Sequence, residues 1–189
     1  MIIDIKTGGW ESWHQYQTAA YDHASEGLPI AFDWSLHRYE LAGMELPSVT
    51  KILFTRGLIS PWSLRDNFAR DRGAAVHQAC ALLPDRLDWS SVDPRCFLYV
   101  CSFAEWLDQT KFVIEAQEQI VCNAAYGYAG TYDLKGYLPF GYNPTRAALY
   151  LQRDGSIAKV RIHDSPADWP YFKKLLSDYR GENEWTRLS

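Results

Sequence analysis

The chain has 189 residues, of which 47% are hydrophobic and 15% aromatic, and its formal net charge is −4. This length and composition fit one folded domain and exclude a disordered chain. A mildly acidic chain also argues against a protein that coats DNA non-specifically, but not against an enzyme whose carboxylates hold metal ions. Because no apolar run approaches the roughly 20 residues that span a bilayer, and residue 1 leads almost directly into a charged motif, we expect a cytoplasmic protein without a membrane partner.

Hydrophobic periodicity and turn signals predict a mixed α/β (α+β) fold, with a central sheet of about five strands flanked by helices. A single domain over residues 1–189 is expected. Ser48 is the expected cap of one helix, and Asp93, followed by Pro94, of another. The predicted elements are, in chain order, a strand at 1–7, a helix at 10–25, a hairpin at 32–46, a helix after Ser48, helices at 65–83 and 93–109, strands at 111–122 and 126–138, a hairpin at 147–163 and a helix at 167–180.

Two charged residues interrupt the first predicted strand, where apolar residues are expected. Asp4 and Lys6 are two positions apart, so they point to the same face of the strand. In that arrangement the acid can bind a metal ion while the lysine contacts the same reacting phosphate. An exposed ion pair on an edge strand explains the pattern equally well.

Asp133 lies on the strand predicted at 126–138, on the same face as Thr131 and Lys135. The small residues Ala129 and Gly130 leave room nearby for a ligand or for a second backbone. Asp133 is therefore a candidate site residue. The alternative is an acid that points outward from a strand with one solvated face.

Glu118 is a candidate on the preceding strand, because strict alternation places it among apolar side chains. A buried carboxylate is costly unless it is paired or bound to a metal ion. A structural ion pair is the competing interpretation. The apolar residues on its expected face are Phe112, Ile114, Ala116 and Ile120.

Two helical segments supply further candidates. His77 lies one turn after Gly73, whose missing side chain would let another element approach the imidazole. Gln17 and Tyr21 are four residues apart, so they share one helix face. Taken alone, a helical histidine such as His77 is usually a satisfied core or surface residue, and the second pair fits an ordinary amphipathic helix.

Together these motifs resemble the PD-(D/E)XK nuclease superfamily in its RecB-like, phage-type exonuclease branch. Each motif is weak alone, but the set spreads over most of the chain and its combination is specific. The resemblance implies a restriction-endonuclease-like core. The motifs that carry the resemblance are the helical histidine motif Arg72–His77, the strand glutamate Glu118, the aspartate motif Gly130–Asp133, the D-x-K motif Asp4–Lys6 and the Q-x-x-x-Y motif Gln17–Tyr21.

The order of the motifs differs from that of the family. The D-x-K and Q-x-x-x-Y motifs, which follow the aspartate strand in the family, lie here within residues 1–29, ahead of all the others. A circular permutation does not explain this order, because the C-terminal hairpin and helix remain last. A transposed block predicts that residues 1–29 either fold back beside strand 126–138 of the same chain or are supplied by a neighbouring chain, as in a segment-swapped dimer.

The resemblance implies a metal site and a catalytic lysine. Lys6 would orient or deprotonate the attacking water or neutralise developing charge, with Lys135, in its own Asp-x-Lys pair, as a competitor. Gln17 and Tyr21 would steady the site, and Glu118 would support it or act as an occasional ligand. The implied ligands of Mg²⁺ or Mn²⁺ are His77, Asp133, Asp4 and the backbone carbonyl of Ile5.

DNA, single-stranded or at duplex ends, is the expected partner. Arginines before His77 could receive phosphates, and tryptophans could stack on unpaired bases. A solvated face explains the arginines at least as well, and core packing explains the tryptophans at least as well. The candidates are Arg65, Arg70, Arg72, Trp10, Trp13 and Trp62.

The four cysteines form no CxxC pair, which argues against a zinc site. Some relatives in the branch carry an iron–sulfur cluster, but ordinary buried thiols are the favoured interpretation here.

The expected function is a Mg²⁺- or Mn²⁺-dependent deoxyribonuclease that hydrolyses phosphodiester bonds, of the exonuclease type. One alternative is a non-catalytic relative that binds DNA ends or acts as an adaptor, against which the retained acids and lysine argue. Another is a restriction-like endonuclease, although such enzymes do not usually carry the helical histidine and the Q-x-x-x-Y pair. A homo-oligomer is possible on this sequence, but no motif specifies one.

Overall fold

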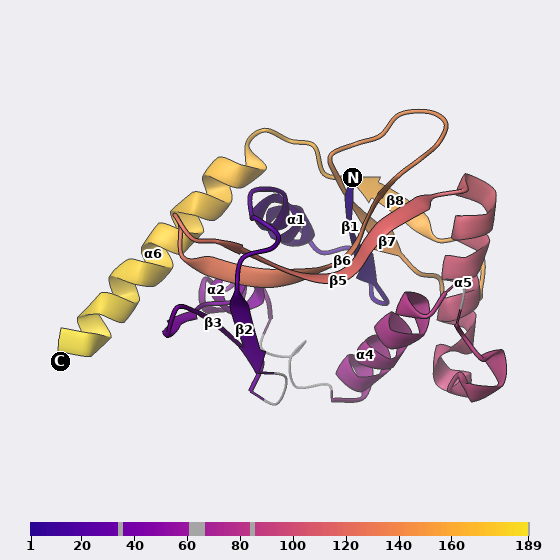
Figure 1. Cartoon of the computed structure of the whole chain (residues 1–189), viewed down its shortest axis with the longest axis horizontal. Coiled ribbons are helices and arrows are strands. Elements are labelled where there is room, and N and C mark those ends of the chain that lie inside the picture. The colour runs from indigo at the N-terminus through magenta and orange to yellow at the C-terminus, as the bar shows by residue number, and fades with distance from the viewer. Residues whose placement is uncertain (34–35, 61–66, 84–85, 189) are drawn as a thin grey trace.

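The computed structural model describes residues 1–33, 36–60, 67–83 and 86–188. Its main feature is a mixed five-stranded sheet in the order β5-β6-β1-β7-β8, flanked by helices (Figure 1). A smaller antiparallel sheet has the order β2-β3-β4. The strands are β1 (Ile2–Lys6), β2 (Ile30–Asp33), β3 (Arg38–Leu41), β4 (Met44–Leu46), β5 (Val113–Asn123), β6 (Tyr128–Tyr137), β7 (Arg146–Tyr150) and β8 (Lys159–Ile162).

The helices begin largely where the sequence provides caps. Ser48 accepts a hydrogen bond from the backbone N–H of Lys51 at the start of α2, and Asp93 accepts one from Arg95 before Pro94 opens α5. Both predicted caps are confirmed. The helices are α1 (His14–Asp22), α2 (Val49–Thr55), α4 (Asn67–Ala81), the short 3₁₀ turn η1 (Trp89–Ser91), α5 (Pro94–Thr110) and α6 (Asp168–Leu188).

Three predicted elements differ in extent from the observed ones. The helix expected from residue 10 begins only at His14, and the side chain of its N-cap residue, Trp13, makes no capping hydrogen bond. The hairpin predicted at 32–46 is a three-stranded sheet, whose last turn has positive φ at both Ala42 and Gly43, the geometry of a tight hairpin turn. The final helix continues beyond residue 180, where the prediction ended it.

Two apolar clusters surround the sheet and fix the helices on it. One packs α4 and α5 against Ile3, Ile5 and Leu149. The other packs α1, α2 and α6 against Tyr128 and Tyr132 of β6. In Figure 1, α6 runs along one flank of the molecule, and α4 and α5 lie on the opposite side. The long β5–β6 hairpin contributes residues to both clusters and so connects them.

The N-terminal block folds back within its own chain, as one of the two predicted arrangements requires. β1 inserts between β6, to which it is antiparallel, and β7, to which it is parallel. It is therefore a central strand, not an edge strand. α1 then crosses the sheet and packs against α6 and β7.

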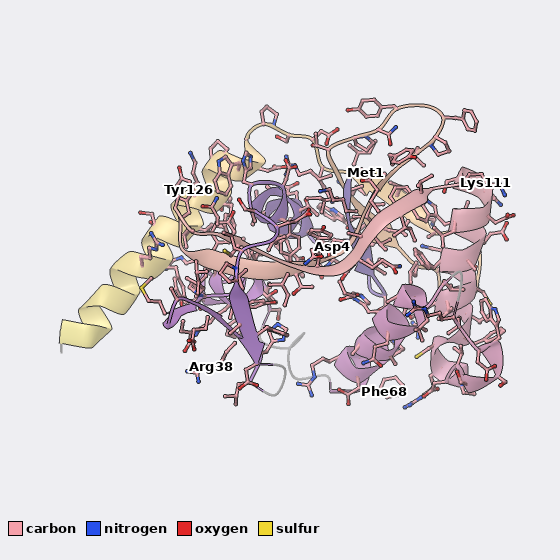
Figure 2. All side chains as sticks on the ribbon, in the orientation of Figure 1. Met1, Asp4, Arg38, Phe68, Lys111 and Tyr126 are labelled. Carbon is pink, nitrogen blue, oxygen red and sulfur yellow. The ribbon has the colours of Figure 1, made fainter. Side chains whose placement is uncertain are left out.

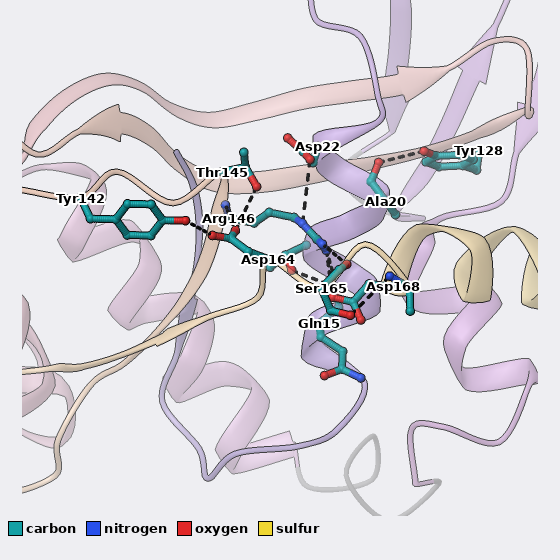
Figure 3. Close-up of polar contacts among 12 residues, drawn as sticks. Gln15, Ala20, Asp22, Tyr128, Tyr142, Thr145, Arg146, Asp164, Ser165 and Asp168 are labelled. Carbon is teal, nitrogen blue, oxygen red and sulfur yellow. Dashed lines mark hydrogen bonds and ion pairs between the residues drawn. The ribbon is translucent and has the colours of Figure 1, made fainter.

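Arg146 joins this block to the C-terminal part of the chain (Figure 3). Its buried guanidinium donates hydrogen bonds to the carbonyl oxygens of Gln15 (3.3 Å) and Ser165 (2.8 Å). It also lies 3.3 Å from the Asp168 carboxylate and 3.9 Å from that of Asp22. These contacts hold α1, β7 and the start of α6 together.

None of the helices in the described ranges combines the length and the apolar character required to cross a bilayer. The four cysteines are free thiols, three of them buried: Cys80, Cys96 and Cys122 are buried and Cys101 is half-buried.

Candidate metal centre

The candidate site lies where β1 separates from β6. β1 pairs with β7 along its whole length, but it pairs with β6 only at Ile2 and Ile3. Beyond Ile3 the backbone of β1 has no partner strand on that side. The Asp133 carboxylate accepts the hydrogen bond from the backbone N–H of Ile5 that the sheet would otherwise take. The separation therefore makes a fork lined by Asp4, Ile5 and Asp133.

His77 closes this fork from α4. Its Nδ1 lies 3.1 Å from Oδ1 of Asp133, and its Nε2 lies 3.1 Å from the carbonyl oxygen of Ile5. Both ring nitrogens thus face oxygen atoms that the resemblance implies as metal ligands. One imidazole and two oxygens from separate elements meet at one point, which the sequence spacing alone does not require.

Glu118 completes a cluster of potential ligands. Donor atoms of His77, Glu118 and Asp133 lie within 4.8 Å of one another, as in a site that could hold a metal ion. Asp4 lies beside this cluster, with its carboxylate ion-paired to Lys6. Figure 2 shows Asp4 near the middle of the molecule, close to the ribbon of the β5–β6 hairpin.

The sequence-based reason for choosing Glu118 is wrong, although the residue lies at the site. The ladder shifts register between Ile114 and Ala116, which pair with Gly136 and its neighbour Lys135. This bulge turns Ile114 to the other face of the sheet, so strict alternation fails. Glu118 is exposed, and not buried among apolar side chains. Its backbone has φ of 47°, in the left-handed region.

Lys6 belongs to a chain of polar contacts that leads into α1. Its ammonium group donates to Oε1 of Gln17 (3.0 Å), and Nε2 of Gln17 donates to the hydroxyl of Tyr21 (2.8 Å). Both helical residues are buried. The ammonium also lies 5.1 Å from the ring centroid of Trp13. The expected connection between the D-x-K strand and the next helix therefore exists as direct contacts.

Two glycines near the site serve different purposes from those expected. A Cβ at Gly130 would lie 2.5 Å from the ring of Tyr21, so the glycine permits the close approach of α1 to β6. A Cβ at Gly73 would meet only the hydroxyl of Thr7, at 3.6 Å, an ordinary contact distance. A larger residue at position 73 would therefore fit without a clash, and a glycine is not needed there to make room beside the imidazole.

Burial and the charges of neighbouring groups together set the ionisation of the cluster. Burial raises the pKa of Asp4 to about 7, and the charge of Asp133 adds to this effect while Lys6 opposes it. Desolvation within the fork, followed by the charge of Asp133, raises the pKa of Glu118 to about 7. Burial alone would lower the pKa of His77, but the charge of Asp133 and its hydrogen bond outweigh that and raise it to about 9. Burial alone would raise the pKa of Asp133, but the charge of His77 and its hydrogen bond outweigh burial and lower that pKa.

The competing lysine lies elsewhere. Nζ of Lys135 is 2.8 Å from Oε1 of Glu26, which also accepts a hydrogen bond from the hydroxyl of Tyr132. Lys6, by contrast, is ion-paired with Asp4 and hydrogen-bonded to Gln17. The structure thus places the two Asp-x-Lys lysines apart, and Lys6, which the sequence favours because its strand leads into the Q-x-x-x-Y helix, is the one beside Asp4.

The predicted DNA-binding residues are scattered. Arg65 and Trp62 lie outside the described residues. Arg70 is exposed and its Nε lies 3.4 Å from the neighbouring Asp71. The Arg72 guanidinium lies over the rings of Phe68 and Tyr99. Trp13 is half-buried beneath Lys6, which fits a structural contact better than an open stacking surface.

His14 is a buried neighbour of the site that the sequence analysis missed. Its Nδ1 lies 2.7 Å from the hydroxyl of Tyr150. Burial, reinforced by the charge of Lys6, lowers the pKa of His14 to about 2. The only sequence signal for a buried His14 was its position on a predicted helix, four residues before Thr18, where the other face of the helix is apolar.

This lowered pKa predicts an acid-sensitive stability. Above pH 6.5 His14 is neutral in both the folded and the unfolded chain. Below that pH only the unfolded chain gains the proton, so His14 lowers the free energy of unfolding by about 1.4 kcal/mol for each pH unit down to its folded pKa. We expect His14→Gln, which can still hydrogen-bond Tyr150, to flatten the pH dependence between pH 6 and 4 in urea denaturation. An unchanged slope would contradict this origin.

A scan against protein-family models finds no match, and a search of curated proteins finds no significant similarity. The site's function therefore has to be argued from its own geometry.

Proposed function

We propose that the protein is a divalent-metal-dependent DNA nuclease of the PD-(D/E)XK type that hydrolyses phosphodiester bonds, and that the five-stranded sheet is a restriction-endonuclease-like core. The observation that supports this most is the meeting of three carboxylates and an imidazole at the strand fork, beside one lysine. These are Asp4, Glu118, Asp133, His77 and Lys6.

The donor set fits a hard divalent cation. Carboxylate and carbonyl oxygens suit Mg²⁺ and Mn²⁺, and an imidazole shifts the preference toward Mn²⁺. Desolvation raises the pKa values of Asp4 and Glu118 first, and the charge of Asp133 adds to it. A bound cation would stabilise the ionised form of both acids. His77, Asp133, Glu118 and the Ile5 carbonyl would hold the ion, with Asp4 beside them. Bound there, it would supply an activated water and positive charge at the phosphate.

The chain's own residues would carry the remaining tasks. Hydrolysis joins the oxygen of water to phosphorus and breaks the bond from phosphorus to the leaving sugar oxygen. The Lys6 ammonium, held between Asp4 and Gln17, can donate a hydrogen bond to the attacking water or to a phosphate oxygen. Gln17 and Tyr21 would keep Lys6 in place through their hydrogen bonds. The exonuclease mode follows from the resemblance, which implies DNA as the substrate, single-stranded or at duplex ends.

Metal-dependent degradation of DNA tests this function. Labelled single- and double-stranded DNA would be incubated with the protein in Mg²⁺, in Mn²⁺ and in EDTA. We expect cleavage with either ion and none in EDTA. Calorimetric titration with Mn²⁺ should show binding that Asp133→Asn weakens by more than the roughly 10–100-fold typical of losing an outer-shell partner.

Asp154→Asn is the matched control, because Asp154 lies in an exposed turn, where its carboxylate accepts hydrogen bonds from Ser156. It should bind Mn²⁺ like the unaltered protein. Mn²⁺ binding without cleavage of any DNA would reject the nuclease in favour of a binding or adaptor protein. No Mn²⁺ binding at all would reject the metal centre.

A further inference from the structure

A hollow in the protein surface lies just beyond the fork, at the end of β1. Its volume is about 840 Å³. The connection from β1 to α1 forms one wall through Thr7–Trp10, and the ends of β7 and β8 form another. Arg72 of α4 and Tyr99 of α5 complete the lining. Four separate parts of the chain therefore converge on it.

The lining is strongly basic although the chain is acidic overall. Its charged residues are all cationic and none is an acid: Arg72, Arg153, Lys159 and Arg161. Within the described ranges none of the four forms an ion pair. Nε of Arg72 is buried and has no hydrogen-bond partner there. In a chain of net charge −4, such a concentration of unpaired cations indicates an anionic ligand.

Aromatic rings accompany these cations. The Arg161 guanidinium lies 4.2 Å from the ring centroid of Trp10, whose side chain is 48% exposed. The Arg72 guanidinium lies 5.3 Å from the ring centroid of Tyr99. Alternating cationic and aromatic groups in a groove are the features that hold single-stranded nucleic acid, because the cations neutralise phosphates while rings stack on bases. A duplex would keep its bases away from Trp10.

The hollow begins close to the fork, at the end of β1. Thr7, which lines it, is only two residues after Ile5, or about 7 Å along an extended strand. Added Cβ atoms at Gly8 and Gly9 would meet nothing within 4 Å, so this wall is open. A strand whose phosphate lies at the fork can therefore extend directly into the hollow.

We infer that this hollow binds an unpaired nucleotide segment next to the cleaved phosphate, with its phosphates on Arg153, Lys159 and Arg161 and a base on Trp10. This inference rests on the proposed nuclease function, because it assigns the hollow to the same nucleic-acid strand. It also specifies the form of the substrate, a single-stranded end that continues past the metal centre.

Oligonucleotide binding in EDTA tests the inference separately from cleavage. Fluorescence anisotropy would be measured with a labelled 12-residue oligothymidylate and with an abasic oligonucleotide of equal length. The test variants are Arg153→Ser/Arg161→Ser and Trp10→Leu. The matched control is Arg86→Ser/Lys174→Ser, which removes the same charge from exposed positions outside the hollow.

We expect the arginine variant to bind both oligonucleotides at least about tenfold more weakly. The slope of log affinity against log salt should fall by about 1.4, since each lost contact to a single strand removes about 0.7. Trp10→Leu should weaken oligothymidylate binding about tenfold and leave abasic binding unchanged, because only the stacked base is lost. The control variant should match the unaltered protein.

Equal losses in the arginine variant and the control would overturn the inference, because they would show a general charge effect. So would equal losses of both oligonucleotides in Trp10→Leu, since no base would then be stacked. If the protein cleaves DNA but the hollow variants bind normally, the inference fails and the proposed function stands. If the hollow variants lose binding as expected but no DNA is cleaved, the nuclease proposal fails and the hollow remains a nucleic-acid site.

Discussion

Lys6→Met is expected to reduce metal-dependent DNA cleavage by roughly 10²–10⁴-fold, the range that a positioned proton-transfer or charge-stabilising group typically contributes. The ammonium of Lys6 is held at the fork by Asp4 and Gln17, close to the proposed ligands. Methionine keeps much of the side-chain volume and removes the charge. Single-turnover cleavage in Mn²⁺, with the protein in excess over the DNA and above the dissociation constant of the complex, measures the loss.

Lys135→Met is the matched control, because Lys135 carries the other Asp-x-Lys lysine and pairs instead with Glu26. We expect it to cleave within about twofold of the unaltered protein, since surface ion pairs contribute little. DNA binding in EDTA should differ little between the two variants, which would locate the Lys6 effect in the chemical step. A larger loss in Lys135→Met than in Lys6→Met would assign the catalytic lysine to β6 and refute the proposed site.

Arg146→Met is expected to lower the free energy of unfolding by about 3–5 kcal/mol, the usual consequence of breaking a buried ion pair from one side. The substitution leaves the buried Asp168 carboxylate without its cation and frees the carbonyl oxygens of Gln15 and Ser165. Because these contacts join α1 to α6 and β7, the loss should loosen the N-terminal block. Urea denaturation at pH 7 measures the change.

Two variants identify the cause of that loss. Arg153→Met removes an exposed arginine near the β7–β8 turn and should change the free energy of unfolding by less than about 0.5 kcal/mol. Arg146→Met/Asp168→Asn should recover part of the stability, because the stranded charge is then absent. If Arg146→Met were as stable as Arg153→Met, the contacts of Arg146 would not hold α1, β7 and α6 together.

The local features of the fold could be read from the sequence because they depend on neighbouring residues. Ser48 and Asp93 cap helices through contacts within their own turn, so the pattern of residue types is sufficient. The placement of Asp4 and Lys6 on one face follows from the two-residue period of a strand, and their ion pair agrees with it. The four-residue spacing of Gln17 and Tyr21 likewise predicted their contact.

Long-range arrangement was decided only by the tertiary structure. Whether residues 1–29 pair within their own chain depends on the register of β1 between two distant strands, which no local pattern contains. The same register ends at Ile3 on the β6 side, and this creates the fork. The sequence favoured Lys6 over Lys135 because the Lys6 strand leads into the Q-x-x-x-Y helix. It did not contain the partners of the two lysines, which lie 11 and 109 residues away along the chain.

A single bulge limited the prediction for β5. Alternation is a reliable guide only while each residue has one partner, and the register shift between Ile114 and Ala116 removes Phe112 and Ile114 from the face assigned to Glu118. The left-handed backbone of Glu118 interrupts the alternation again. Glu118 was thus selected for a burial that it does not have. The basic hollow was predicted only in part. Arg72 and Trp10 were candidates for DNA binding, but Arg153 and Arg161 carried no signal, because they meet Arg72 only when α4 and the β7–β8 hairpin pack beside the end of β1. Residue types and short spacings therefore determined the elements and the candidate chemistry, whereas strand register and helix packing, which depend on contacts between distant residues, decided which candidates meet.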